Sequence, residues 1–214
     1  MRAIVAALPR EVSRLVKGWE RRLVSPNAFV YRKGDVLVTC AGMGAARVTR
    51  AVQAALAEGA TELVSAGLAG ACDPGLQVGD VVRAGVVVDS RTGERFGAGD
   101  EVLVTAPSIA SVREKARLWA TYGARAVDME AATVARLAAA HGVQFRAVKV
   151  ISDDAGFELE ELGRFATDDG QFREAAFAAY AVMRPRLWGK LIELAGNSKK
   201  ALGALTEVMR AEFD

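Results

Sequence analysis

The sequence is poor in the side chains that most often carry enzyme chemistry. Its 214 residues include a single histidine, His141, and two cysteines, Cys40 and Cys72, far apart in the chain. One histidine without a nucleophile-elbow sequence beside it argues against a Ser-His-Asp or Cys-His nucleophile. The histidine and cysteine content also leaves no set of zinc ligands at the usual spacing. We therefore expect no metal site, no cofactor and two free thiols, as in a reducing compartment.

The sequence also lacks a strong net charge and long apolar runs. Its 28 basic residues nearly balance its 26 acidic ones, so composition gives no reason to expect nucleic acid or an acidic membrane as a partner. No segment has the apolar length of a membrane-spanning helix, and the apolar run in "MRAIVAALPRE" is too short for a signal-peptide core. Hydrophobic residues make up 51% of the chain, enough for a substantial core. We expect a cytoplasmic protein with one domain, residues 1–214.

What the sequence does have is an alternation of strand-like and helix-like segments. Strands are predicted at 2–8, 28–42 (a hairpin turning at 33–35), 61–67, 78–90, 100–106 and 144–152, and helices at 10–19, 44–59, 111–123, 131–140 and from 168 onward, interrupted near Pro185. The polar, glycine-rich stretch 89–101 is typical of a surface loop or hairpin. Because the strands are apolar throughout and interleaved with helices, we predict an α/β fold whose sheet is covered on both faces.

Two glycine-rich segments follow predicted strands. In "CAGMGAARVTRAV" (40–52), glycines 42 and 44 stand where a strand passes into a helix, and amides at such a helix start can hold an anion or a ribose oxygen. A dinucleotide fingerprint is not supported, because a third glycine and a following acidic residue are missing at the required spacing. In "SAGLAGACDPG" (65–75), small residues allow a ligand close to the backbone, although a tight strand exit explains them equally.

Acidic residues gather at the ends of the predicted strands. They are Glu11, Asp128, Glu130, Asp153 and Asp154. Each alone has an ordinary explanation as a helix-start acid, a cap or a turn residue. In an open α/β sheet, however, ligand sites lie beyond the carboxyl ends of the strands. Acids that converge there predict a site for a polar neutral or cationic ligand, with a carboxylic acid as proton donor and a carboxylate for ribose hydroxyls.

Four stretches, in order, resemble the purine nucleoside phosphorylase / uridine phosphorylase superfamily. They are "AALPREV", "CAGMGAARV", "SAGLAGACDPGLQVGDVV" and "VDMEAATVARLAAAHGVQFRAVKVISDDA", and together they span about residues 1–155. They are most similar to the nucleosidase branch, the 5′-methylthioadenosine/S-adenosylhomocysteine nucleosidases. The resemblance implies a single-domain, three-layer phosphorylase/hydrolase-like fold with a central mixed sheet, a small-molecule nucleoside substrate and a homo-oligomer.

The resemblance also implies roles for individual residues. Glu130 would accept hydrogen bonds from ribose hydroxyls, with Met129 against the sugar. Asp153 would protonate N7 of the departing purine, and Glu11 would activate a water. Further substrate-binding positions fall on Gly67, Ile109 and Ser152. N-glycosidic cleavage passes through a ribosyl oxocarbenium ion, so a proton on the base and a carboxylate near the ribose both favour it. Asp153 can act as an acid only if apolar surroundings keep it protonated, which the preceding run "AVKVI" favours.

Two positions depart from the nucleosidase pattern. Leu68 stands where these enzymes usually have a serine, and Ile109, within "VTAPSIA", stands where an aromatic residue packs on the base. These features resemble the hopanoid-associated members of the superfamily, which act on an adenosine attached to a large lipid. The usual methylthioadenosine specificity is therefore not expected without change.

Three functional hypotheses follow. The leading one is hydrolysis of the N-glycosidic bond of a purine nucleoside, most simply a 5′-modified adenosine, because Glu11 is present. The alternative is phosphorolysis to free base and ribose 1-phosphate, including an adenosylhopane-type substrate, with Arg10, Gly44 and Arg47 as candidate phosphate ligands. The third is a nucleoside-binding module without catalysis, against which the complete acid set argues.

Overall fold

A mixed sheet with helices on both faces forms the centre of the molecule. The computed structural model describes residues 1–25, 28–157, 165, 180, 184 and 188–213. Its strands are β1 (Arg2–Ala6), β2 (Glu20–Ser25), β3 (Ala28–Lys33), β4 (Val36–Cys40), β5 (Glu62–Ala71), β6 (Val81–Ala84), β7 (Val86–Asp89), β8 (Arg95–Gly97), β9 (Val102–Thr105), β10 (Ala124–Asp128) and β11 (Gln144–Asp153). Its helices are α1 (Pro9–Val12), α2 (Ala45–Ala57), α3 (Val112–Tyr122), α4 (Ala131–Ala140) and α6 (Trp188–Phe213).

Strand β5 organises the sheet. The described strands follow the order β2-β3-β4-β1-β5-β10-β9-β7-β8, and β11 joins β5 to β6. The first half of β5 pairs in parallel with β1, and its last residues pair antiparallel with β10, where Val127 lies opposite Gly70. Strand β11 runs parallel to β5 along most of its length and brings Asp153 opposite the same Gly70. The carboxyl ends of β10 and β11 therefore both arrive beside the second half of β5.

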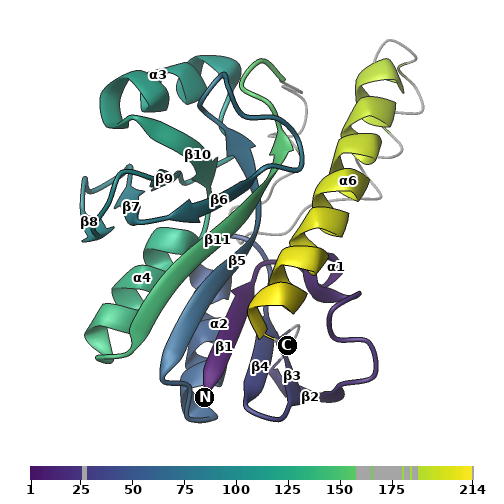
Figure 1. Ribbon diagram of the computed structural model, residues 1–214, viewed down its shortest axis with the longest axis vertical. Coiled ribbons are helices and arrows are strands. Elements are labelled where there is room, and N and C mark those ends of the chain that lie inside the picture. Colours follow the sequence, from purple (N-terminus) through teal and green to yellow (C-terminus); the bar gives the residue numbers. More distant parts are fainter. Residues whose placement is uncertain (26–27, 158–164, 166–179, 181–183, 185–187, 214) are drawn as a thin grey trace.

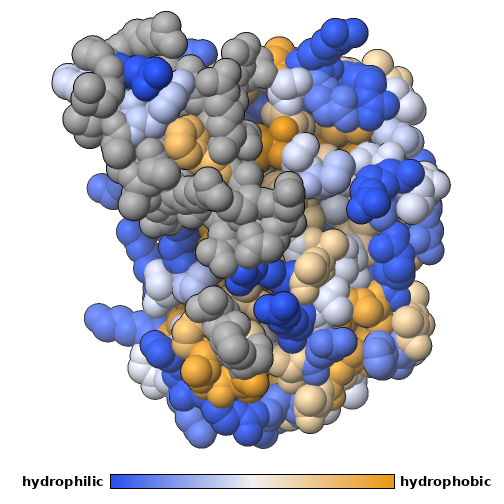
Figure 2. All heavy atoms as spheres, turned by 180° about the vertical axis from the view of Figure 1, so that it is seen from behind, coloured by the Kyte–Doolittle hydropathy of each residue, from blue (hydrophilic) through white to orange (hydrophobic). Residues whose placement is uncertain are grey.

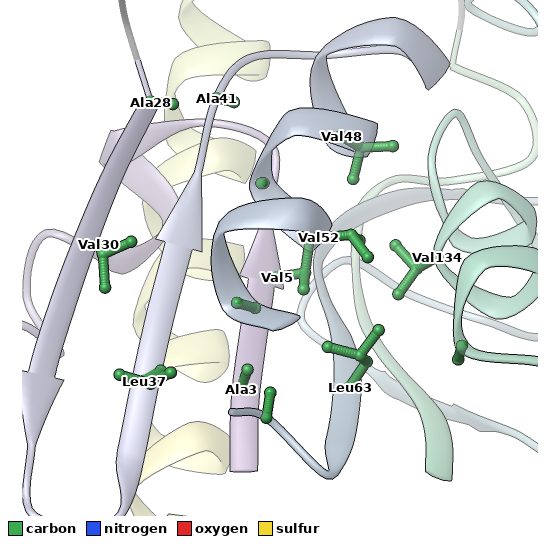
Figure 3. Packing of buried hydrophobic residues seen from close by; sticks show 14 residues of the cluster. Ala3, Val5, Ala28, Val30, Leu37, Ala41, Val48, Val52, Leu63 and Val134 are labelled. Atoms are coloured by element: carbon green, nitrogen blue, oxygen red, sulfur yellow. The ribbon is translucent and has the colours of Figure 1, made fainter. Parts of the chain in front are cut away.

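The helices form an outer layer on each face of the sheet. On one face, α2 and α4 pack on β1 and β5 through residues such as Val52, Val134 and Leu63 (Figure 3). On the other face, α1 and α6 cover β1, β5 and β11, with Leu205 and Met209 of α6 in the core. Figure 1 shows α6 in front of the sheet and α2 and α4 behind it. The predicted three-layer α/β fold with a mixed sheet is thus confirmed, while a single domain over 1–214 stays a prediction.

Most predicted elements lie close to their expected bounds. The hairpin turns between Lys33 and Val36, and α2, α4, β9 and β11 occupy the predicted segments. Helix α3 ends at Gly123, which takes a left-handed conformation (φ 63°) that favours glycine. The stretch 89–101 forms the hairpin of β7 and β8. The predicted interruption near Pro185 lies outside the described residues.

Three expectations were wrong in detail. The helix predicted at 10–19 ends at Val12, and the chain continues through separate turns that still bury Leu15 and Val16, so apolar spacing here reflects burial rather than a helix. Strand β5 continues to Ala71 through the small-residue segment expected to turn, because β10 and β11 pair with it there. Strands β2 and β10 were not predicted, since their short, charged sequences lack an apolar run.

The surface and the thiols agree with the composition. Figure 2, the view from behind, shows hydrophilic residues spread among smaller groups of hydrophobic ones. Within the described part of the chain, no helix has both the length and the apolar character needed to cross a membrane. Cys40 and Cys72 are free, as predicted, and both are buried. Burial raises the pKa of each thiol to about 12, so neither is a thiolate nucleophile at neutral pH.

Candidate functional site

One pocket of about 610 Å³ lies beside the second half of β5, where the chain leaves β1, β10 and β11. Its wall also includes the segment before α3 and the N-terminal half of α6. The predicted site residues that line it are Glu11, Glu130, Asp153, Met129, Ser152, Ile109 and Arg10. The structure therefore brings together the three acids that the sequence places more than 140 positions apart at the extremes.

Glu11 is held by backbone amides. It belongs to the short helix α1 after β1 and is buried. The amide of Leu8 donates to its Oε2 (2.8 Å), and the amide of Leu68 donates to its Oε1 (3.2 Å). Gly67 makes this possible, because a Cβ on this residue (φ 153°) would lie 3.0 Å from Oε1. Gly67, predicted to contact substrate, instead leaves room for Glu11, and the fixed carboxylate is suited to accept a proton in the pocket.

Glu130 stands at the start of α4 and faces the start of α2. The amide of Gly44, the N-cap of α2, donates to its Oε1 (2.8 Å). Burial raises the pKa of Glu130 to about 7; the nearby carboxylate of Asp128 adds to the rise, while Lys149 and the Gly44 amide oppose it. Because this amide serves Glu130, it is not free for an anion.

The predicted phosphate ligands are separated by the structure. Arg10 lines the pocket, but Gly44 and Arg47 do not. Arg47 folds back along Gly42 and reaches the carbonyl of Ala41 (3.5 Å). Of the three candidates, only Arg10 is placed to meet an anion inside the pocket.

Asp128 lies in a closed buried network. Its Oδ2 contacts the Nζ atom of Lys149 (2.8 Å) and accepts from the amide of Ala131 (2.9 Å), so it caps α4 as predicted. Its Oδ1 accepts from the hydroxyl of Thr105 (2.7 Å). Burial lowers the pKa of Lys149, but the carboxyls of Asp128 and Glu130 outweigh it and hold this pKa above its usual value. The network ties β11, β10 and β9 to the start of α4.

Asp153 has a partner that the sequence analysis missed. The Nζ atom of Lys115, from α3, lies 2.5 Å from its Oδ2 and also donates to the carbonyls of Asp154 (2.8 Å) and Phe157 (3.2 Å). The hydroxyl of Ser152 donates to Oδ1 (2.7 Å). The surroundings of Asp153 are therefore not only apolar: a buried ammonium group and a hydroxyl both contact its carboxyl.

The sequence does contain a signal that Lys115 is buried. In "SVREKARLWATYG" it follows Val112 by three positions and precedes Leu118 by three, on the face that α3 buries. A lysine on an apolar helix face needs a buried partner, and Asp153 is that partner. The carbonyl of Asp154 accepts from Lys115, and its side chain accepts from the amide of Gly156 (2.9 Å), as in a turn.

Comparison with known proteins identifies the family. The model of the phosphorylase superfamily matches residues 2–112 and 102–184. The chain belongs to the phosphorylase superfamily. This confirms the resemblance found in the sequence and, at the level of the family, the prediction of an enzyme. None of the curated proteins matches this superfamily member.

Solved structures share the fold of this superfamily member. A putative methylthioadenosine nucleosidase from Weissella paramesenteroides is 24% identical, with a TM-score of 0.64 over 74% of this chain and 90% of its own. The 5′-methylthioadenosine/S-adenosylhomocysteine nucleosidase of Helicobacter pylori is 15% identical, with a TM-score of 0.68 over 98% and 97%. Futalosine hydrolase of the same organism is 17% identical, with a TM-score of 0.67 over 98% and 97%. At these identities the likeness concerns the fold.

The remaining chemistry of this superfamily member is limited. His141 is the C-cap of α4 and does not line the pocket. Among the residues that the structure describes, no cluster of histidine, cysteine and acidic side chains has the arrangement of a metal site. Leu68 and Ile109, the two departures from the nucleosidase pattern, both line the pocket. The site thus offers carboxylates, two cations and an apolar wall.

Proposed function

We propose that this protein hydrolyses the N-glycosidic bond of a purine nucleoside, in particular a 5′-modified adenosine, and releases the base. The observation that carries the proposal is that Glu11, Glu130 and Asp153, from three separate strand exits, line one pocket of about 610 Å³. This volume falls in the usual range of small-molecule sites, roughly 300–1,000 Å³. Acids at three points of one pocket suit a reaction that needs a base, a proton donor and a partner for a developing cation.

Each acid has a distinct part in the proposed reaction. Glu11, fixed through both oxygens, accepts a proton from the attacking water. Glu130, in its ionised form, accepts hydrogen bonds from the ribose hydroxyls and favours the oxocarbenium charge, with Met129 beside the sugar. Asp153 faces the base and mediates the proton that the leaving purine needs. Attack by water on the anomeric carbon then gives free ribose derivative and free base.

The apolar wall supports a substituent at the 5′ position. Leu68 and Ile109 line the pocket, as do Leu191 and Leu194 of α6. A hydrophobic group of the substrate would displace water from this wall, which is worth about 25 cal/mol per Å² of apolar surface buried. The unsubstituted hydroxyl of adenosine would gain nothing there. We infer that 5′-modified adenosines are better substrates than adenosine.

A released-base assay tests the proposal. The purified protein is incubated with a panel of adenosines that carry hydroxyl, methylthio or longer apolar groups at the 5′ position, with and without phosphate. Release of adenine that is independent of phosphate, with free ribose derivative as the second product, is the expected result. Strict dependence on phosphate with formation of a ribose 1-phosphate would replace hydrolysis by phosphorolysis. Binding without turnover over the whole panel would leave the non-catalytic module.

Phosphorolysis has one observation in its favour. Arg10 follows the first strand beside Glu11 and lines the pocket, and a guanidinium fork can bind phosphate through two hydrogen bonds. An Arg10→Gln variant separates the readings: it loses activity if phosphate is the nucleophile and keeps most of it if water is. A homo-oligomer, implied by the family resemblance, also stays a prediction; sedimentation of the purified chain measures it.

A further inference from the structure

Lys115 is a buried cation that the proposed reaction does not yet use. Its side chain is only 2% exposed, whereas that of Asp153 is 23% exposed and opens onto the pocket. All three ammonium hydrogens have acceptors: Asp153 Oδ2, the carbonyl of Asp154 and the carbonyl of Phe157. The 2.5 Å separation from Oδ2 places the ammonium in direct hydrogen-bond contact with the carboxyl.

The fold leaves room for this pair. A Cβ on Gly70 of β5 would lie 2.8 Å from Asp153 Oδ2 and 3.1 Å from Lys115 Cε. Of the other acids that line the pocket, Glu11 and Glu130 are bound to backbone amides, and Asp128 is enclosed with Lys149. Asp153 therefore differs from these acids in being both 23% exposed and paired with a buried cation. The Lys115 side chain reaches the pocket wall from α3.

The leaving group of the proposed reaction needs a proton, which the pair of Lys115 and Asp153 could supply. A purine leaves with the electron pair of the C1′–N bond and needs a proton to become neutral. The Lys115 ammonium donates to one oxygen of Asp153 and the Ser152 hydroxyl donates to the other. The hydrogen that Lys115 directs at Oδ2 is therefore a proton within reach of the Asp153 carboxyl.

We propose that Lys115 is a positioning residue of the reaction that acts through Asp153, holding the carboxyl toward the base and supplying its proton. This rests on the proposed function. As the C1′–N bond breaks, the electron pair passes to the base, the base takes a proton from Asp153, and Asp153 takes one from the Lys115 ammonium. Water gives its oxygen to C1′ and a proton to Glu11. Exchange with solvent then returns a proton to Lys115 and removes one from Glu11, so protons balance over a cycle.

The test compares leaving groups that do and do not need a proton. With a 5′-modified adenosine, Lys115→Met is expected to lower kcat by ~10²-fold or more with little change in KM, the scale of general acid catalysis. With 4-nitrophenyl riboside, whose phenolate leaves unprotonated, kcat is expected to fall by less than about threefold. Lys115→Arg keeps a cation against Asp153 and is expected to recover part of the loss. Arg117→Met, on the exposed face of the same helix, is the matched control and leaves both rates unchanged.

The outcomes separate this inference from the proposed function. If the wild-type protein cleaves no nucleoside, the proposed function fails. If it cleaves the adenosine substrate but Lys115→Met slows both leaving groups equally, loses KM instead of kcat, or slows neither, then Lys115 has only a structural role and the inference is overturned. Should Lys115→Met fail to fold, as a melting curve would show, Gly70→Ala disturbs the same pair sterically while keeping both residues. A selective loss of adenosine cleavage in that variant supports the inference, and an equal loss overturns it.

Discussion

Two lysine–aspartate pairs lie at neighbouring strand ends and differ in one respect. In each, a lysine that is 2% exposed contacts Oδ2 of the aspartate, and a hydroxyl donates to Oδ1 over 2.7 Å. The pair of Lys149 and Asp128 is closed, because the Asp128 side chain is 0% exposed and its second bond goes to the start of α4. The pair of Lys115 and Asp153 is open, because the Asp153 side chain is 23% exposed and lines the pocket.

The same two groups, a lysine ammonium and an aspartate carboxyl, have a structural role in the closed pair and a proposed functional role in the open pair. A buried ion pair is weak evidence for stability on its own, because desolvation offsets the attraction between the charges. The two pairs differ in whether solvent or a ligand can reach the aspartate carboxyl. The closed pair has all its acceptors occupied by protein and can only hold β9, β10, β11 and α4 together. The open pair leaves carboxylate oxygen facing a space where a substrate can sit, so changes there should appear in turnover before they appear in stability.

The largest expected effect is on turnover at the open pair. Asp153→Asn removes the group that passes a proton to the base, and we expect kcat for a 5′-modified adenosine to fall by ~10²–10⁴-fold. The melting temperature should fall less than when the enclosed Asp128 loses its cation, since Asp153 is 23% exposed and Lys115 keeps the carbonyls of Asp154 and Phe157 as acceptors. Steady-state kinetics and a melting curve on the same preparation measure both. A large loss of stability with a proportionate loss of activity would show that the two pairs do not differ as proposed.

The corresponding change at the closed pair should act on stability. Lys149→Met leaves the Asp128 carboxylate buried without its cation, and breaking such a pair by removing one partner typically costs about 3–5 kcal/mol. Urea unfolding measures this loss. The double variant Lys149→Met with Asp128→Asn removes the stranded charge as well and should be more stable than Lys149→Met alone. If the double variant is the less stable one, Asp128 matters as the cap of α4 rather than as the partner of Lys149.

Much of this contrast could be anticipated from the sequence, and part of it could not. The strand ends and the acids Glu11, Glu130 and Asp153 were visible because apolar runs mark where strands stop, and ligand sites of α/β sheets lie there. Lys149 stands inside the apolar run "AVKVIS", which marks it as a residue that needs a buried partner. Which aspartate each lysine meets depends on the packing of α3 and the pairing of β10 with β5, and neither β10 nor its antiparallel pairing had a clear pattern.

The helix expected at 10–19 also shows that an apolar pattern does not fix the local backbone structure. Val12, Leu15 and Val16 have the spacing of a helix face and are buried, but burial does not distinguish a helix from a series of turns over a short segment. Gly18, in a left-handed conformation (φ 81°), lies in the stretch that replaces the helix. For the same reason the small residues 67–71 were taken for a turn, although strand pairing on both sides keeps them extended.

A smaller effect concerns the pH dependence of nucleoside binding at Glu130. Neither Lys115 nor Lys149 forms an ion pair with this residue among those found in the described part of the chain. Its pKa is raised to about 7 by burial, so the protonated form dominates below that pH and the carboxylate above it. Its contribution to stability is then full below the unfolded-state pKa of about 4.3 and is lost as the pH rises through about 7. Because the carboxylate is the better acceptor for ribose hydroxyls, the Kd of a nucleoside should fall by up to about tenfold between pH 6 and 8.

Binding is measured by calorimetry on the Asp153→Asn background, where turnover is slow enough to keep the ligand intact. The matched control is Glu130→Gln on that background, which does not titrate and should give a Kd that is flat over the same range. An equal pH dependence in both proteins would assign the titration to another group and remove Glu130 as the ribose partner.

The smallest expected effects come from removing the hydroxyls of Ser152 and Thr105, each of which donates to Oδ1 of one of the two aspartates. Ser152→Ala removes the hydrogen bond to Asp153 Oδ1, which is worth about 0.5–1.5 kcal/mol; on the open pair this should lower kcat a few-fold and leave the melting temperature nearly unchanged. Thr105→Val removes the bond to Asp128 Oδ1 and leaves the amide of Ala132 without its acceptor. An unsatisfied buried donor costs about 1–3 kcal/mol, so this variant should lose stability and keep its kcat. The two substitutions break bonds of the same length to the same atom of two aspartates, so a crossed result, with Ser152→Ala unstable and Thr105→Val slow, would reverse the assignment of the open and closed pairs.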